Sequence, residues 1–158
     1  MTAEATLSLR GVFPPIPTPF DARGEVASGA LRENLARWNQ YGLAGYVVLG
    51  SNGEAVYLDW EEKLQVLRIV REAAAPGKLV IAGVDCESTR EAIRLVQAAA
   101  DAGADAALVV TPHYYTNRMS SESLVRHYHA VAEASPIPIL IYNVPPYTHL
   151  DIDAATVA

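Results

Sequence analysis

Residues 79–110 read LVIAGVDCESTREAIRLVQAAADAGADAALVV and decide the fold. Two short apolar runs, 79–82 and 106–110, are bounded by turn residues, which is typical of strands buried on both faces. The segment 88–102 between them has apolar residues at helical spacing and stops at Gly103, a residue type that readily takes the left-handed turn closing a helix. A strand, a helix and a second strand in succession predict a βα unit of a parallel sheet.

The same alternation continues on both sides of this unit. Further strands are expected at 12–19, 46–49 and 138–142, and further helices at 28–41, 59–74 and 120–134. Asp59 with Glu62, and Ser88 with Glu91, have the spacing of capping boxes, in which side chains satisfy the free N–H groups of a helix start. The five strand starts are separated by a mean of about 31.5 residues, so eight units would need about 252 residues, close to the roughly 250 of a (β/α)₈ barrel.

This repeat favours an α/β fold, a (β/α)₈ TIM barrel of which about the first five βα units are present. Residues 1–158 are then a single domain, the N-terminal part of such a barrel. Asp151 or Asp153 is expected to cap one more helix, so by this pattern the sequence ends within a helix. A complete five-stranded doubly wound sheet fits the strand count as well. It is disfavoured because FPPIPTPF, residues 13–20, carries four prolines, which cannot donate hydrogen bonds in a central strand.

Composition excludes several classes of protein. Apolar residues make up 51% of the chain and charged residues 19%, which excludes disorder and allows a buried core. No run of about 18 apolar residues occurs, so no membrane partner is expected, and the net charge of −6 argues against a nucleic-acid partner. The single Cys86 and the first ten residues, which have neither a signal-peptide core nor an arginine-rich transit pattern, indicate a cytoplasmic protein, with the mitochondrial matrix as the alternative.

Candidate site residues follow from the barrel, because its sites form at the carboxyl ends of the strands. The turn GSNGE at 50–54 has two glycines that let the backbone bend and point N–H groups inward, which suits a small anion such as a carboxylate. An ordinary βα loop is equally compatible, with Glu54 as a structural hydrogen-bond partner. The turn has neither the spacing of a dinucleotide fingerprint nor the lysine of a phosphate loop. Other strand ends carry Asp85 and His113.

The remaining polar residues have plain alternatives. Tyr142 ends a predicted strand and could shuttle a proton there, although a tyrosine at the edge of the core is the simpler interpretation. Tyr114 and Tyr115 form a tandem pair, which is more typical of packing or of a subunit contact. His127 and His129 are two apart on a helix and point to different faces, so no metal site is expected.

Four motifs at these strand ends occur together: PTPF at 17–20, GSNGE at 50–54, TPHYY at 111–115 and YNVP at 142–145. On these motifs the chain resembles the dihydrodipicolinate synthase / N-acetylneuraminate lyase family of class I pyruvate-type aldolases, over residues 9–158. Each motif alone is weak, whereas four in register on a βα repeat are specific to the superfamily.

Finer features resemble one branch, the 4-hydroxy-2-oxoglutarate aldolases, which release pyruvate and glyoxylate. These features are TPHYYTNRMSS at 111–121, DCEST at 85–89 and Ser-Asn at 51–52, where synthases usually carry two threonines. Tyr147 stands where the synthases place an arginine that holds a second carboxylate, and His149 replaces a common glycine. The alternatives are dihydrodipicolinate synthase, another lyase or dehydratase of the family, or a catalytically inactive half-barrel.

The resemblance implies a mechanism in which a lysine forms a Schiff base with a pyruvate-type 2-oxo acid, so that no metal or organic cofactor is needed. Tyr142 matches the proton-shuttling tyrosine, Ser51 the hydroxyl relay, and Tyr114 the relay tyrosine that a neighbouring subunit supplies, with Tyr115 as the alternative. Ser51 and Asn52 match the binding place of the 2-oxo acid carboxylate. The resemblance also implies a homo-oligomer, a dimer or a tetramer.

The Schiff-base lysine has no match in this chain. Lys63 lies within the predicted helix 59–74 and Lys78 precedes the strand 79–82, and neither is expected to reach the site. The family carries this lysine on the sixth strand, which the repeat would start near roughly residue 170. We therefore expect the lysine beyond residue 158, and the 158-residue chain to be inactive alone.

Overall fold

The computed structural model describes residues 7–157; residues 1–6, within the stretch expected to carry no targeting signal, and residue 158 lie outside it. Its centre is a four-stranded sheet in the order β1-β2-β3-β4, in which every neighbouring pair is parallel. The strands are β1 (Gly45–Val48), β2 (Leu79–Val84), β3 (Ala106–Val110) and β4 (Ile139–Tyr142). Each strand therefore lies beside the next one in the chain, as in a barrel wall.

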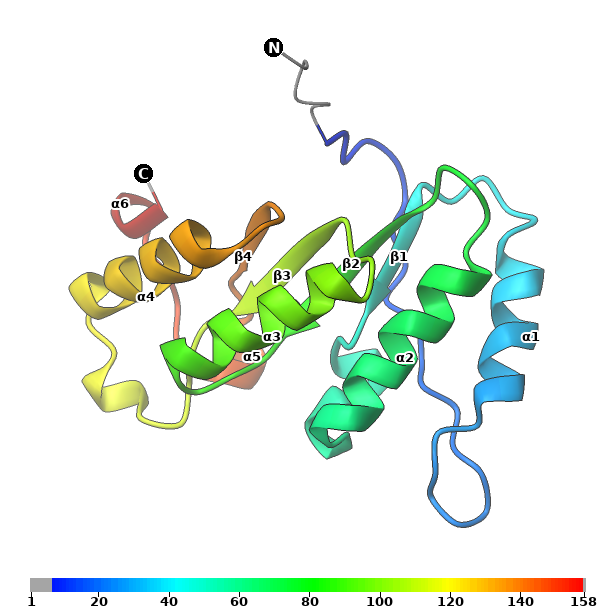
Figure 1. Cartoon of the computed structure of the whole chain (residues 1–158). Coiled ribbons are helices and arrows are strands. Elements are labelled where there is room, and N and C mark those ends of the chain that lie inside the picture. Colours follow the sequence, from blue (N-terminus) through cyan, green and yellow to red (C-terminus); the bar gives the residue numbers. More distant parts are fainter. Residues whose placement is uncertain (1–6, 158) are drawn as a thin grey trace.

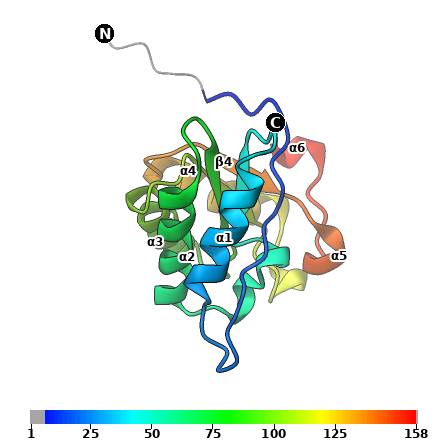
Figure 2. The same cartoon turned by 90° about the vertical axis from the view of Figure 1, so that its right-hand side faces the viewer.

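Four longer helices connect and follow the strands. They are α1 (Ser28–Trp38), α2 (Trp60–Ala73), α3 (Thr89–Asp101) and α4 (Ser121–Ala134), followed by the short α5 (Pro145–Thr148) and α6 (Ala154–Val157). Figure 1 shows α2 and α3 across the same face of the sheet, and Figure 2 shows α5 on the opposite side of the molecule. The doubly wound alternative does not hold, because its strand order reverses at a switch point and this one does not. Within residues 7–157, no helix is long and apolar enough to cross a membrane.

Side-chain caps fix where the helices begin. The Asp59 carboxylate accepts the Glu62 N–H at 2.8 Å, and the Glu62 carboxylate accepts the Asp59 N–H at 2.8 Å, which confirms the predicted capping box at α2. At α3 the Ser88 hydroxyl accepts the Glu91 N–H at 3.2 Å, so one half of the predicted box is present. Asp153 accepts the Thr156 N–H at 2.7 Å and is the cap of α6, the choice that the sequence left open.

The predicted strand 12–19 is wrong in detail. The segment runs parallel to β1 but makes only one isolated bridge, between Pro15 and Val47. Its prolines have no N–H group, so the segment donates only from Ile16, to the Val47 carbonyl at 3.0 Å, and accepts from Val47 through the Pro14 carbonyl at 3.0 Å. The result is an extended edge beside β1 rather than a regular strand.

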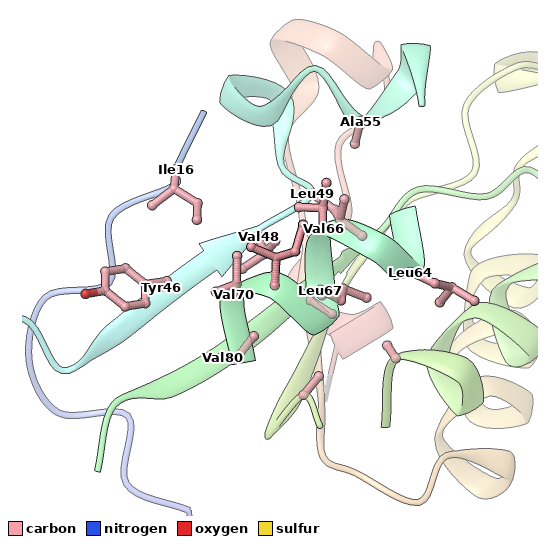
Figure 3. Packing of buried hydrophobic residues seen from close by; sticks show 14 of the residues in the cluster. Ile16, Tyr46, Val48, Leu49, Ala55, Leu64, Val66, Leu67, Val70 and Val80 are labelled. Carbon is pink, nitrogen blue, oxygen red and sulfur yellow. The ribbon is translucent and has the colours of Figure 1, made fainter. Parts of the chain in front are cut away.

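The core lies between the sheet and its helices. Figure 3 shows Val48 of β1 against Val66, Leu67 and Val70 of α2, all of them almost fully buried. The buried Tyr46 points its hydroxyl out of this cluster and donates to the Asn39 side chain at 2.9 Å, so its polar atom is satisfied. A second cluster joins β3 to α3 and α4.

The other face of the sheet is less covered. Side chains alternate along a strand, so Tyr46 and Val48 face the helices while Val47 faces the opposite way and is only half-buried. On the same face lie Leu108 and Val110 of β3, also half-buried. The site lies on this second face, at the carboxyl ends of the strands.

Candidate functional site

A cavity of about 430 Å³ lies at the carboxyl ends of all four strands. Leu49 after β1, Gly83 of β2, Val110 of β3 and Tyr142 of β4 all contribute to its wall. Gly83 is required there, because a Cβ at this position would lie 2.3 Å from the Leu49 carbonyl oxygen. The cavity is therefore where a parallel barrel is expected to place its chemistry.

One wall is the predicted anion-binding turn. Ser51–Gly53 forms a single 3₁₀ turn whose own hydrogen bonds use the N–H groups of Gly53 and Glu54. The N–H groups of Ser51 and Asn52 take no part in those two bonds, as is usual at the start of a helical turn. A Cβ on Gly53 would lie 3.1 Å from the Ile16 carbonyl oxygen, so the glycine lets the N-terminal segment pack closely under the turn.

The structure brings together two of the four predicted site residues. Ser51 and Tyr142 both line the cavity, and Tyr142 is half-buried as the last residue of β4. Asn52 is exposed and does not line the cavity. Tyr114 is 74% exposed and packs edge-on against Tyr115 with ring centroids 4.9 Å apart, so the pair projects from the loop after β3 instead of filling the site.

Asp85 and His113, to which the sequence motifs assign no role, also line the cavity. The His113 Nδ1 atom lies 3.3 Å from a carboxylate oxygen of Glu87 and 3.9 Å from one of Asp85. Burial raises the pKa of Asp85 above its ordinary value, and the nearby His113 partly opposes this shift. Candidate ligand atoms of these three side chains lie within 4.8 Å of one another, so they are the one group in residues 7–157 with metal-ligand spacing.

Glu87 and His113 are held in place by hydrogen bonds with the loop after β3. Glu87 accepts the backbone N–H groups of His113 at 3.0 Å and of Tyr114 at 2.9 Å. The Thr111 carbonyl lies 3.3 Å from His113 Nδ1. These contacts join the loop after β2 to the loop after β3. Hydrogen bonding alone therefore explains why Glu87 and His113 lie close together, without a metal ion.

Neither lysine lines the cavity. Lys78 lies at the amino end of the sheet, where its Nζ donates to the carbonyls of Tyr41 at 3.0 Å and Leu43 at 2.9 Å. Lys63 is closer to the site than expected, because it lines a neighbouring cavity of about 300 Å³ together with Asp85 and Cys86. Burial there raises the pKa of the Cys86 thiol to about 11.

Sequence reasoning placed His113 and Asp85 at strand ends but could not single them out. Their contacts with Glu87 depend on how two loops converge, and no short motif records that convergence. Tyr147, which the resemblance sets at the place of the synthases' arginine, lines the cavity. Thr148 was missed because the short helix α5 that carries it has no periodic apolar pattern.

Comparison with known proteins agrees with this geometry. The Dihydrodipicolinate synthetase family matches residues 8–158. The 4-hydroxy-tetrahydrodipicolinate synthase of Synechococcus sp. (strain WH7803) is 44% identical over 145 residues, which are 89% of this chain and 46% of that protein. The chain thus spans about half the length of the curated relatives it matches.

Solved structures give the same result. The 4-hydroxy-tetrahydrodipicolinate synthase from Methylacidiphilum fumariolicum SolV has a TM-score of 0.89 at 35% identity, over 95% of this chain and 49% of its own. The chloride-inhibited dihydrodipicolinate synthase from Acinetobacter baumannii, complexed with pyruvate, has a TM-score of 0.88 at 41% identity, over 94% of this chain and 50% of its own. The predicted fold, the first units of a (β/α)₈ barrel, is confirmed. The chain belongs to the dihydrodipicolinate synthetase family.

Proposed function

We propose that this chain supplies the 2-oxo acid site and the proton relay of a Schiff-base lyase or synthase that acts on pyruvate. The observation that carries the proposal is the shared cavity, which brings the Ser51 turn and the Tyr142 phenol together at the carboxyl edge of the sheet. Membership of the family and the pyruvate complex of the Acinetobacter relative support the choice of substrate.

In this proposal the carboxylate of pyruvate binds at the Ser51 turn, where Ser51 lines the cavity and its N–H is not used by the turn itself. Asn52, which the resemblance pairs with Ser51, lies outside the cavity lining, and its N–H is likewise not used by the turn. Tyr142 moves protons at the reacting carbon, with the hydroxyl of Ser51, which lines the same cavity, as a relay. Tyr114 is exposed and therefore available to a second copy of the chain, in line with the expected homo-oligomer. The nucleophilic lysine comes from beyond residue 158, because neither Lys63 nor Lys78 lines the cavity.

The first candidate for the complete reaction is synthesis of 4-hydroxy-tetrahydrodipicolinate. The matched curated relatives carry this name at 41–46% identity. They favour this alternative over 4-hydroxy-2-oxoglutarate cleavage, which the sequence features had placed first. The aldolase remains a second candidate because Tyr147, and no arginine, lines the cavity from α5.

One assay separates the two reactions. The chain is expressed with the coding sequence that follows residue 158 in its gene. It is supplied with pyruvate and the amino aldehyde that would furnish the ring nitrogen, or with 4-hydroxy-2-oxoglutarate. We expect the cyclic product, identified by mass spectrometry, in the first mixture. Pyruvate release in the second mixture alone would establish the aldolase, and activity in neither would contradict the proposal.

A further inference from the structure

His113 lines the same cavity as Ser51 and lies on the loop that follows β3. Its side chain is 34% exposed, so one part of the ring is covered by protein and another part remains accessible. Asp85, on the loop that follows β2, lines the same cavity, so the two side chains are placed to contact one ligand.

The contacts of the ring fix which nitrogen is free. Nδ1 lies 3.3 Å from the Thr111 carbonyl oxygen, 3.3 Å from the Glu87 carboxylate and 3.9 Å from the Asp85 carboxylate. All of these groups accept hydrogen bonds, so Nδ1 is the nitrogen that carries the hydrogen. Within residues 7–157 the ring makes no hydrogen bond through Nε2, which is left for a ligand.

Glu87 fixes the ring and its backbone at the same time. One carboxylate oxygen accepts the N–H groups of His113 and Tyr114 at 3.0 and 2.9 Å, while the other faces Nδ1. A side chain tied at both points can hold the imidazole in one orientation, as the carboxylate of a catalytic triad does. Glu87 is therefore placed to act through His113.

The charge of the wall limits what Nε2 can contact. Among the described residues that line the cavity, the charged side chains are those of Glu54 and Asp85, both acidic, and no lysine or arginine is among them. With Glu87 behind the ring, this wall disfavours a further carboxylate. A neutral hydroxyl suits it better, since an imidazole with its hydrogen on Nδ1 accepts a hydrogen bond at Nε2.

We propose that His113 accepts, at Nε2, a hydrogen bond from the hydroxyl that the aldehyde oxygen of the second substrate becomes in the adduct, with Glu87 and Asp85 as positioning residues. This inference rests on the proposed function and extends it by naming His113 as a residue that recognises the second substrate. In the proposed function pyruvate is bound at the Ser51 turn, through contacts that do not include His113.

The test separates the two substrates in the pyruvate-active protein. His113→Phe keeps an aromatic ring and removes Nε2. We expect kcat/KM for the aldehyde to fall about tenfold or more, the loss of about 1.4 kcal/mol of binding. Exchange of the pyruvate methyl protons with solvent should stay within about twofold, as should both values in the control His129→Phe, which changes an exposed residue of α4.

The outcomes are distinguishable. An unchanged kcat/KM for the aldehyde, with exchange intact, would overturn the role of His113, and so would an equal loss of both activities. Absence of pyruvate exchange in the unmodified protein would instead overturn the proposed function.

Glu87→Gln tests the positioning role. Glutamine keeps an oxygen that can accept the two backbone N–H groups but loses the charge beside Nδ1. Nitrogen NMR of the His113 ring in the 158-residue chain should show the Nδ1–H tautomer, and Glu87→Gln should reduce its share. Glu91→Gln, a change on α3 next to the same loop, should leave the tautomer unaltered. A ring protonated at Nε2 in the unmodified chain, or one that is insensitive to Glu87→Gln, would contradict the inference.

Discussion

Ser51 and Tyr142 line the same cavity although they follow β1 and end β4, the two outer strands of the sheet. Four flat strands would hold their outer members about 14 Å apart. Because side chains at the ends of both outer strands line one cavity, we infer that the sheet curves around its less covered face, as the wall of a barrel does. The curvature of the sheet is thus what joins the predicted anion turn to the predicted proton shuttle.

Replacing Tyr142 by phenylalanine should slow turnover by about 100-fold or more in the pyruvate-active protein, since positioned proton transfer contributes that much to comparable reactions. The phenol lies in the cavity, so thermal unfolding should change little. Tyr41→Phe is the matched control, because Tyr41 is exposed and lies at the amino end of the sheet near Lys78. Unchanged turnover in the Tyr142 variant would remove the phenol from the mechanism.

The Cys86 thiol should react slowly in the folded chain. Burial raises its pKa from 9.0 to about 11, which lowers the thiolate share near neutral pH by about 100-fold, and the thiolate is the reactive form. Iodoacetamide labelling at pH 8, followed by mass spectrometry, should therefore be far slower in the native chain than in urea. Equal rates in both states would show that the thiol is not held in this environment.

His127 should make the chain less stable in mild acid. It is 6% exposed, its Nδ1 lies 3.0 Å from the Thr89 hydroxyl, and its buried Nε2 has no partner among the described residues. Burial lowers the pKa of His127. The unfolded chain therefore takes up the proton first, and stability falls as pH drops from the unfolded pKa of about 6.5 towards the lower folded value.

Urea unfolding between pH 7.5 and 5 measures this dependence. His127→Gln keeps a hydrogen-bonding group near Thr89 but cannot titrate, so this part of the pH dependence should disappear. His129→Gln, on the exposed side of the same helix, should leave the dependence as it is. An identical pH profile in unmodified chain and His127→Gln would contradict the burial argument.

Loss of the α2 cap should be measurable in the same assay. Asp59→Ala removes the carboxylate that accepts the Glu62 N–H, which should cost about 1 kcal/mol, within the range of about 0.5–2 kcal/mol for such caps. Asp101→Ala, at the exposed last residue of α3, is the control and should change stability by less than about 0.5 kcal/mol. A cap variant as stable as the control would show that the reciprocal bonds at Asp59 do not contribute.

The sequence predicted the parallel βα order because strands, caps and stops are encoded locally. Val84 was left out of its strand because Gly83 interrupts the apolar run, yet Gly83 belongs there since no Cβ would fit against Leu49. The segment 12–19 has the apolar content of a strand but not the N–H groups, so the ladder could not form. An apolar pattern predicts a strand correctly only where the backbone also has the N–H groups that a strand needs.

The site could be predicted only where one element carries the signal. Ser51 lies in a glycine turn and Tyr142 ends a strand, and both features are visible in the sequence. The position of Asn52 outside the cavity and the cluster of His113 with Glu87 depend on loop packing between different units. Such contacts are set by the tertiary fold, so spacing along the chain does not reveal them.

The central claim is tested most directly by trapping with borohydride in the presence of pyruvate. A reduced adduct adds the mass of pyruvic acid less one oxygen, and peptide mapping locates the lysine that carries it. We expect no adduct on the 158-residue chain and, in a chain extended through the sixth strand to barrel closure, an adduct on a lysine beyond residue 158. A stable adduct on Lys63 or Lys78 of the short chain would contradict the claim.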